Sequence, residues 1–87
     1  MALGHGEFLR TLRPLLAGRC WRREGGRIRI AVPPGEVEIR LGPEGRRRLG
    51  SLVLPETEVT LVFEGLPGDR AEAFLEAFAR AFRRGGG

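Results

Sequence analysis

The side chains best suited to nucleophilic catalysis occur once each in this chain of 87 residues, as Cys20, His5 and Ser51. A Cys–His or Ser–His pair works only when its two members lie within hydrogen-bond reach of each other. His5 lies near the N-terminus and Cys20 in a polar connection, which would have to fold back onto the first residues. We therefore predict a non-enzymatic protein, with no catalytic residue and no small-molecule substrate.

Neither a metal nor a cofactor is expected. The single His and the single Cys cannot complete a tetrahedral zinc site. The segment Gly45–Ser51 has the glycine spacing of a phosphate loop, but it lacks the lysine of that motif and leads into a strand instead of a helix. We interpret it as a basic connection between two strands.

All 15 basic residues are arginine, and the net charge is +4. The guanidinium group binds phosphate bidentately, but a coding bias would also replace every lysine. The candidate contacts to an anionic ligand are Arg46, Arg47, Arg48, Arg22 and Arg23. If these clusters converge beside Trp21, they predict nucleic-acid binding. The 11 interleaved acidic residues argue against it.

Two helices are predicted to flank the centre of the chain. The spacing of apolar residues indicates a first helix over 6–17, which Pro14 is expected to end or to kink. A second helix is expected to follow Asp69, a good N-cap, with Glu72 at capping-box spacing. Each helix has one apolar face, so both faces must be buried.

Alternating apolar residues predict strands at 28–32, 37–41, 52–54 and 59–63. Two hairpins are expected, with Val32 opposite Val37 in the first and Leu54 opposite Val59 in the second. The predicted fold class is therefore α+β: a helix, a four-stranded antiparallel meander and a helix, with both helices packed on one face of the sheet. Residues 1–84 are expected to form one domain, followed by a flexible glycine tail at 85–87.

Leu49, Val53 and Val62 have no apolar partner in this arrangement, since they fall on the uncovered face of the sheet. An exposed apolar patch is typical of a contact surface. We therefore predict a small bacterial-type accessory or adaptor domain that acts through protein–protein contacts, with a homodimer as one form of them. The alternative is an arginine-rich nucleic-acid-binding module.

The cytoplasm is the predicted location. No apolar run approaches the ~20 residues that a membrane span needs, and the N-terminus does not have the pattern of a secretory signal. A single cysteine excludes an internal disulfide and is typical of a reducing compartment. No membrane partner is expected.

Overall fold

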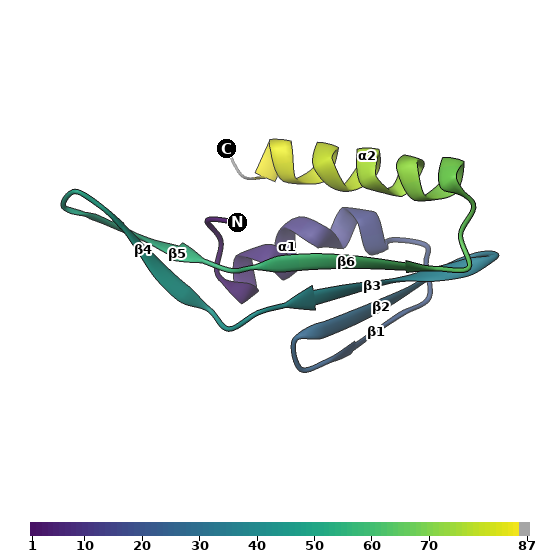
Figure 1. Cartoon of the computed structure of the whole chain (residues 1–87), viewed down its shortest axis with the longest axis horizontal. Coiled ribbons are helices and arrows are strands. Elements are labelled where there is room, and N and C mark those ends of the chain that lie inside the picture. Colours follow the sequence, from purple (N-terminus) through teal and green to yellow (C-terminus); the bar gives the residue numbers. More distant parts are fainter. Residues whose placement is uncertain (86–87) are drawn as a thin grey trace.

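The computed structural model describes the backbone of residues 1–85 and the side chains of residues 1–83. It confirms the α+β class (Figure 1), with elements in the order α1 (His5–Leu16), β1 (Trp21–Glu24), β2 (Arg27–Val32), β3 (Gly35–Leu41), β4 (Gly45–Leu49), β5 (Leu52–Glu56), β6 (Val59–Glu64) and α2 (Gly68–Gly85). Of the expected tail, Gly85 belongs to α2 and the last two residues lie outside the described part of the chain. Over residues 1–85, no helix is long and apolar enough to span a membrane.

The strands form two sheets, not one. Four antiparallel strands follow the order β1-β2-β3-β6, and β4 pairs with β5 in a separate two-stranded sheet. The expected meander is thus corrected, because residues 52–54 pair with β4 and β6 pairs with β3. The pairing of β6 with β3 sets Leu61 beside Ile39 and Phe63 beside Val37, so apolar side chains meet across the strands.

The first hairpin was predicted on the correct strands but in the wrong register. Val37 lies opposite Ile30, and Val32 lies opposite Gly35, so the turn contains only Pro33 and Pro34. The shift of two residues leaves every side chain on its expected face, because side chains alternate with a period of two. The apolar face of the hairpin is therefore the one that was predicted.

Two strands were not predicted. β1 pairs with β2 across a Gly25–Gly26 turn, and all its side chains are exposed, so it lacks the alternation that marks a half-buried strand. β4 reads Gly-Arg-Arg-Arg-Leu, which resembles a loop in composition. Its turn to β5 contains only Gly50 and Ser51, and the positive φ of Gly50 (62°) suits a two-residue hairpin.

The core takes side chains from both helices and from one face of the four-stranded sheet. α1 contributes Phe8, Leu12 and Leu16 and continues past Pro14, so the helix does not end there. The sheet contributes Ile28, Ile30, Val32, Val37 and Ile39, and α2 contributes Phe74, Phe78 and Phe82. α2 begins at Gly68, so Asp69 lies in its first turn and is not its N-cap.

Candidate functional site

The feature that distinguishes this molecule is the β4–β5 hairpin, residues 45–56, which we call the arm. It projects from one end of the body along the long axis of a molecule measuring 47 × 25 × 21 Å (Figure 1). Each strand of the arm has five residues, so its paired part is about 17 Å long. Such a two-stranded ribbon fits the major groove of double-stranded DNA, about 12 Å wide.

Both faces of the arm carry arginine and apolar side chains. The register pairs Arg46 with Pro55, Arg47 with Leu54 and Arg48 with Val53. Because successive side chains point to opposite faces, one face holds Arg46, Arg48, Val53 and Pro55, and the other holds Arg47, Leu49, Leu52 and Leu54. An object on either side of the ribbon therefore meets at least one guanidinium group.

The arm exposes groups that a folded protein normally covers. Leu49, Leu52 and Val53 are 51%, 56% and 45% exposed, at and beside the turn. All of β4 is exposed, and among the described residues no ion pair or side-chain hydrogen bond involves its arginines. The arm thus presents three free positive charges and an apolar tip.

The base of the arm is fixed to the body by polar contacts on both of its sides. Thr57 is fully buried; its hydroxyl donates to the Leu3 carbonyl (2.7 Å), and its N–H donates to the Met1 carbonyl (2.8 Å). On the other side of the base, the His5 N–H donates to Glu44 Oε1 (2.6 Å), and the His5 ring contacts the Gly42 carbonyl (2.8 Å). These contacts set the direction in which the arm leaves the body.

The three residues predicted as a protein contact do not form one patch. Leu49 and Val53 lie on opposite faces of the arm. Val62 lies on β6, beside Glu38 on the outer face of the sheet, and is half-buried. The apolar surface that sequence reasoning missed is the arm tip with Leu52, and the signal for it was the Gly50–Ser51 turn.

The predicted arginine clusters do not converge either. Arg22 and Arg23 lie on β1, which two strands separate from β6, and they point to opposite faces of the sheet. Trp21, the expected stacking partner, is also on β1 and about half exposed. The arm therefore carries Arg46, Arg47 and Arg48 without the β1 residues.

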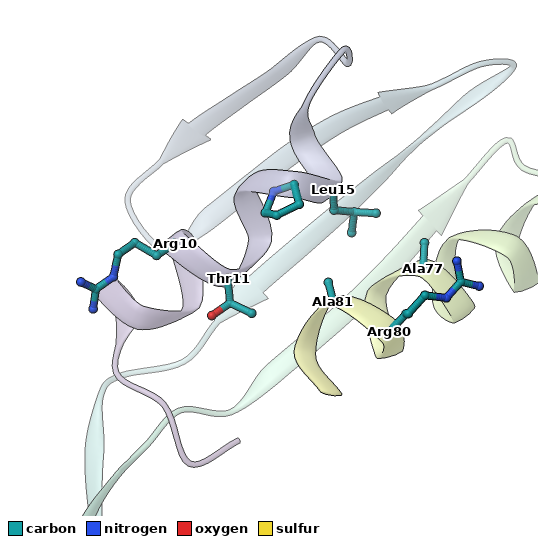
Figure 2. Close-up of a pocket in the computed structure, with 7 residues that line it drawn as sticks. Arg10, Thr11, Leu15, Ala77, Arg80 and Ala81 are labelled. Carbon is teal, nitrogen blue, oxygen red and sulfur yellow. The ribbon is translucent and has the colours of Figure 1, made fainter. Parts of the chain in front are cut away.

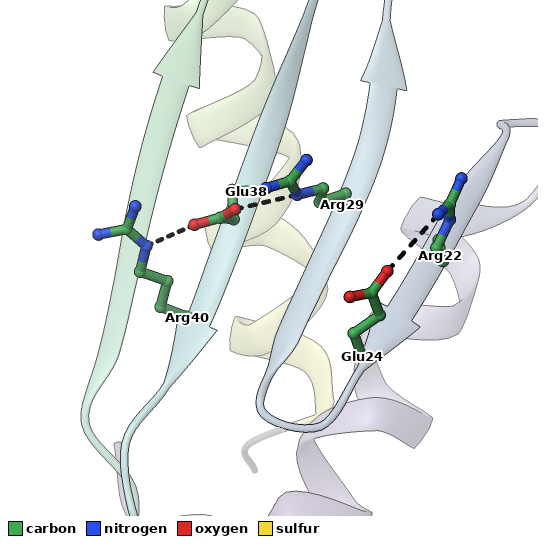
Figure 3. A network of polar contacts seen from close by, with 5 residues as sticks. All are labelled: Arg22, Glu24, Arg29, Glu38 and Arg40. Carbon is green, nitrogen blue, oxygen red and sulfur yellow. Dashed lines mark hydrogen bonds and ion pairs between the residues drawn. The ribbon is translucent and has the colours of Figure 1, made fainter.

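Three arginines on the outer face of the sheet differ from those of the arm, because they are paired with carboxylates (Figure 3). Glu38 is only 8% exposed and accepts hydrogen bonds from Arg40 Nε and from Arg29 Nε (3.1 Å). The hydrogen bond from Arg40, with the charges of Arg40, Arg29 and Arg27, holds the pKa of Glu38 below its ordinary value of 4.5, although burial opposes this shift. Arg22 pairs with Glu24 at 3.5 Å on the same face.

An apolar groove lies between α1 and α2 (Figure 2). Thr11, Leu15, Ala77 and Ala81 line it, and the guanidinium groups of Arg10 and Arg80 point away from each other at its margins. The Thr11 hydroxyl donates to the Glu7 carbonyl within its own helix (2.9 Å). The lining includes no carboxylate, thiol or imidazole for acid–base or nucleophilic chemistry.

His5 lies apart from both candidate nucleophiles, Cys20 and Ser51. His5 begins α1, whereas Cys20 follows its end, and a helix of 12 residues separates them by about 18 Å. Ser51 is in the turn of the arm. Within the described residues, no three His, Cys, Asp or Glu side chains are grouped so that they could hold a metal ion.

Comparison with protein-family models, with curated proteins and with solved structures gives no match for this chain. Its function must therefore be argued from the arm and from the rest of the surface.

Proposed function

We propose that this protein is a non-enzymatic module that binds nucleic acid by placing the arm in a groove of the duplex. The observation that carries the proposal is the projecting two-stranded ribbon with free arginines on both faces. A groove has a phosphate backbone on each side, so a ribbon inserted into it needs positive charge on both of its faces. Arg47 on one face, and Arg46 with Arg48 on the other, meet that requirement.

The apolar tip also fits this role. In the major groove, whose width suits the ribbon, apolar side chains contact the methyl group of thymine. Leu49 and Leu52 lie opposite each other at the turn, and both are more than half exposed. In this arrangement the arginines contact phosphates along the groove while the two leucines contact the bases.

Part of the positive charge on the rest of the surface is already paired with carboxylates. Arg29 and Arg40 already bind Glu38, and Arg22 binds Glu24, so each would have to exchange a carboxylate for a phosphate. The arginines of the arm have no carboxylate partner among the described residues, so they can bind phosphate without giving one up. The proposed location is the cytoplasm of a bacterial cell, because a lone, exposed cysteine such as Cys20 is typical of a reducing compartment.

Protein binding through the arm is the second candidate. The observation in its favour is the exposure of Leu49 and Leu52 side by side on one face, with Val53 exposed on the other, since exposed apolar surface is typical of protein contacts. An adaptor of this type would hold a partner through the arm tip, with the arginines at the rim. Its affinity would depend on the leucines more than on salt.

The experiment is a titration of labelled DNA and RNA duplexes, followed by fluorescence anisotropy at several salt concentrations. We expect replacement of Arg46, Arg47 and Arg48 by Glu to weaken binding by on the order of tenfold or more and to reduce the salt slope by about 3. The matched control replaces Arg10, Arg13 and Arg80 by Glu, which changes the net charge equally on the helices.

Three outcomes would overturn the proposal: a wild-type protein that binds no duplex at low salt, an arm variant that binds as wild type does, or an equal loss in both triple variants. Circular dichroism of each variant shows that it has folded. A wild-type preparation with a protein-like ratio of absorbance at 260 and 280 nm, together with loss of a protein partner on Leu52→Ala, would favour the adaptor instead.

A further inference from the structure

The two edges of the four-stranded sheet are very different. β1 has four residues, three of them charged, and charged edge strands resist pairing with other chains. β6 has six residues and is uncharged from Val59 to Phe63. Four of those five residues are apolar, and all four are only half-buried. No described strand pairs with the outer side of β6. Such an edge is suited to pairing with another strand.

The backbone groups that β6 offers can be identified. Gly42 N–H donates to the Glu58 carbonyl (2.8 Å), so these opposite residues form a hydrogen-bonded pair of the β3–β6 ladder. Because such pairs alternate along an antiparallel ladder, Val59, Leu61 and Phe63 direct their N–H and C=O groups away from β3. Thr57 is two residues before Val59, so its N–H and C=O also point away from β3, and both bind Met1. Apart from this contact with Met1, no described strand pairs with the outer edge of β6.

α2 adds a second contact surface beside this edge. It packs on β6, where the rings of Phe74 and Phe63 lie 6.1 Å apart, and it meets α1 along the groove that Ala77 and Ala81 line. By helical geometry, the flank of α2 that faces away from α1 carries Leu75, Ala79, Glu72, Glu76 and Arg83. Leu75 is 42% exposed at the middle of that flank.

We propose that β6 pairs antiparallel with β6 of a second copy of this chain, joining two sheets into one. Leu61 pairs with itself across a two-fold axis, and Val59 pairs with Phe63, so all three residues with outward backbone groups find partners. The α2 helices then lie antiparallel beside each other, with Leu75 near Ala79 of the second copy. This arrangement is independent of the arm and of what the arm binds.

The charges on α2 favour a second copy of this chain as the partner of β6. Glu72 is in the first half of the exposed flank and Arg83 is near its end, so antiparallel packing sets each Glu72 against Arg83 of the second copy. The axis implied by that pairing lies between residues 77 and 78. The strand gives a second estimate of the axis, because Phe63 lies beside Phe74 of α2. Leu61 is about 7 Å from Phe63 along β6, a distance that corresponds to about four to five residues of α2 counted from Phe74. The strand therefore places the axis near residues 78–79 of α2, about one residue from the position that the helix charges imply.

The test begins with sedimentation velocity of the full chain over a range of concentrations. We expect a species of twice the 9.6 kDa chain mass. Glu72→Arg and Arg83→Glu each create two like-charged contacts, and we expect each to weaken dimerisation roughly tenfold to thirtyfold. Arg80→Glu, a control on the flank toward α1 with the same charge change as Arg83→Glu, is expected to leave the mass unchanged.

A mixture of the two weakened variants gives the decisive result. One Glu72→Arg chain with one Arg83→Glu chain restores two opposite-charge contacts, so the mixture is expected to dimerise as wild type does. A wild-type monomer at all concentrations, or a mixture that stays monomeric, would overturn the proposal. A dimer that Glu72→Arg and Leu75→Arg leave intact would also overturn it, because the contact would then lie elsewhere. The arm triple variant is expected to remain dimeric.

Discussion

The body and the arm are built from the same kinds of residue, with opposite results. In the body, β2 and β3 alternate apolar and charged side chains, and the apolar ones are buried against α1 and α2. In the arm, β4 and β5 also carry arginine, leucine and valine, but β4 is wholly exposed and β5 is buried only in part, at Leu54 and Pro55. Leu52 is 56% exposed, whereas Ile30 is fully buried.

The difference lies in what packs on each sheet. A two-stranded ribbon alone is marginally stable in water, and it persists here because Thr57, Met1 and His5 fix its base to the body. Its apolar side chains contribute little to folding, so their exposure is retained for another reason. The charges show the same contrast, since Glu38 binds two arginines of the body and none of the arm.

The largest expected effect is in the core of the body. Phe78 packs in a cluster with Phe82, whose ring centroid is 4.5 Å away, and Phe8, whose centroid is 6.2 Å away. We expect Phe78→Ala to lower the free energy of unfolding by about 3–5 kcal/mol. Leu52→Ala is expected to change it by at most about 0.5 kcal/mol. Urea denaturation at low protein concentration measures both. A similar loss of unfolding free energy for Leu52→Ala would mean that the arm tip is covered in solution, and it would contradict the contrast between a buried body and an exposed arm.

The elements of the body could be predicted because their sequence patterns report burial. The helical stripes and the alternation in 28–32 and 37–41 arise from one large core, so they identified α1, α2, β2 and β3. The same logic missed β1 and β4, whose side chains are all exposed. A strand that buries nothing leaves only its turn residues as a signal, here Gly25–Gly26 and Gly50–Ser51.

The pairing of β6 could not be read from the sequence for another reason. The alternation predicts pairing of residues 59–63 with residues 52–54, the neighbouring apolar segment along the chain, but it does not distinguish this partner from any other apolar strand. The structure pairs β6 with β3 across the whole arm, because Val37 and Ile39 offer a face already packed on both helices. For that reason Val62 lies apart from Leu49 and Val53, and the predicted contact surface divides between the arm and the sheet.

A smaller effect is expected where the arm joins the body. Thr57→Val removes the hydroxyl that donates to the Leu3 carbonyl and leaves that buried carbonyl without a partner. We expect a loss of about 1–2 kcal/mol in unfolding free energy, together with faster hydrogen exchange at Thr57. Thr60→Val, on the exposed face of β6, is the matched control and is expected to be near neutral. If Thr57→Val is neutral as well, the base contacts do not hold the arm.

The smallest effect concerns the charges of the body and appears only in acid. Because the pKa of Glu38 in the folded state lies below its ordinary value of 4.5, the pairing with Arg40 and Arg29 stabilises the fold above that pH and is lost as the pH falls through the folded-state value. Glu38→Gln is expected to lower stability at neutral pH and to flatten the decline of melting temperature below pH 4.5. Glu64→Gln, on the same face, is the control for the charge change. An equally steep acid decline in Glu38→Gln would show that Glu38 is not held ionised by its arginines, and the contrast between paired arginines in the body and free ones in the arm would then disappear.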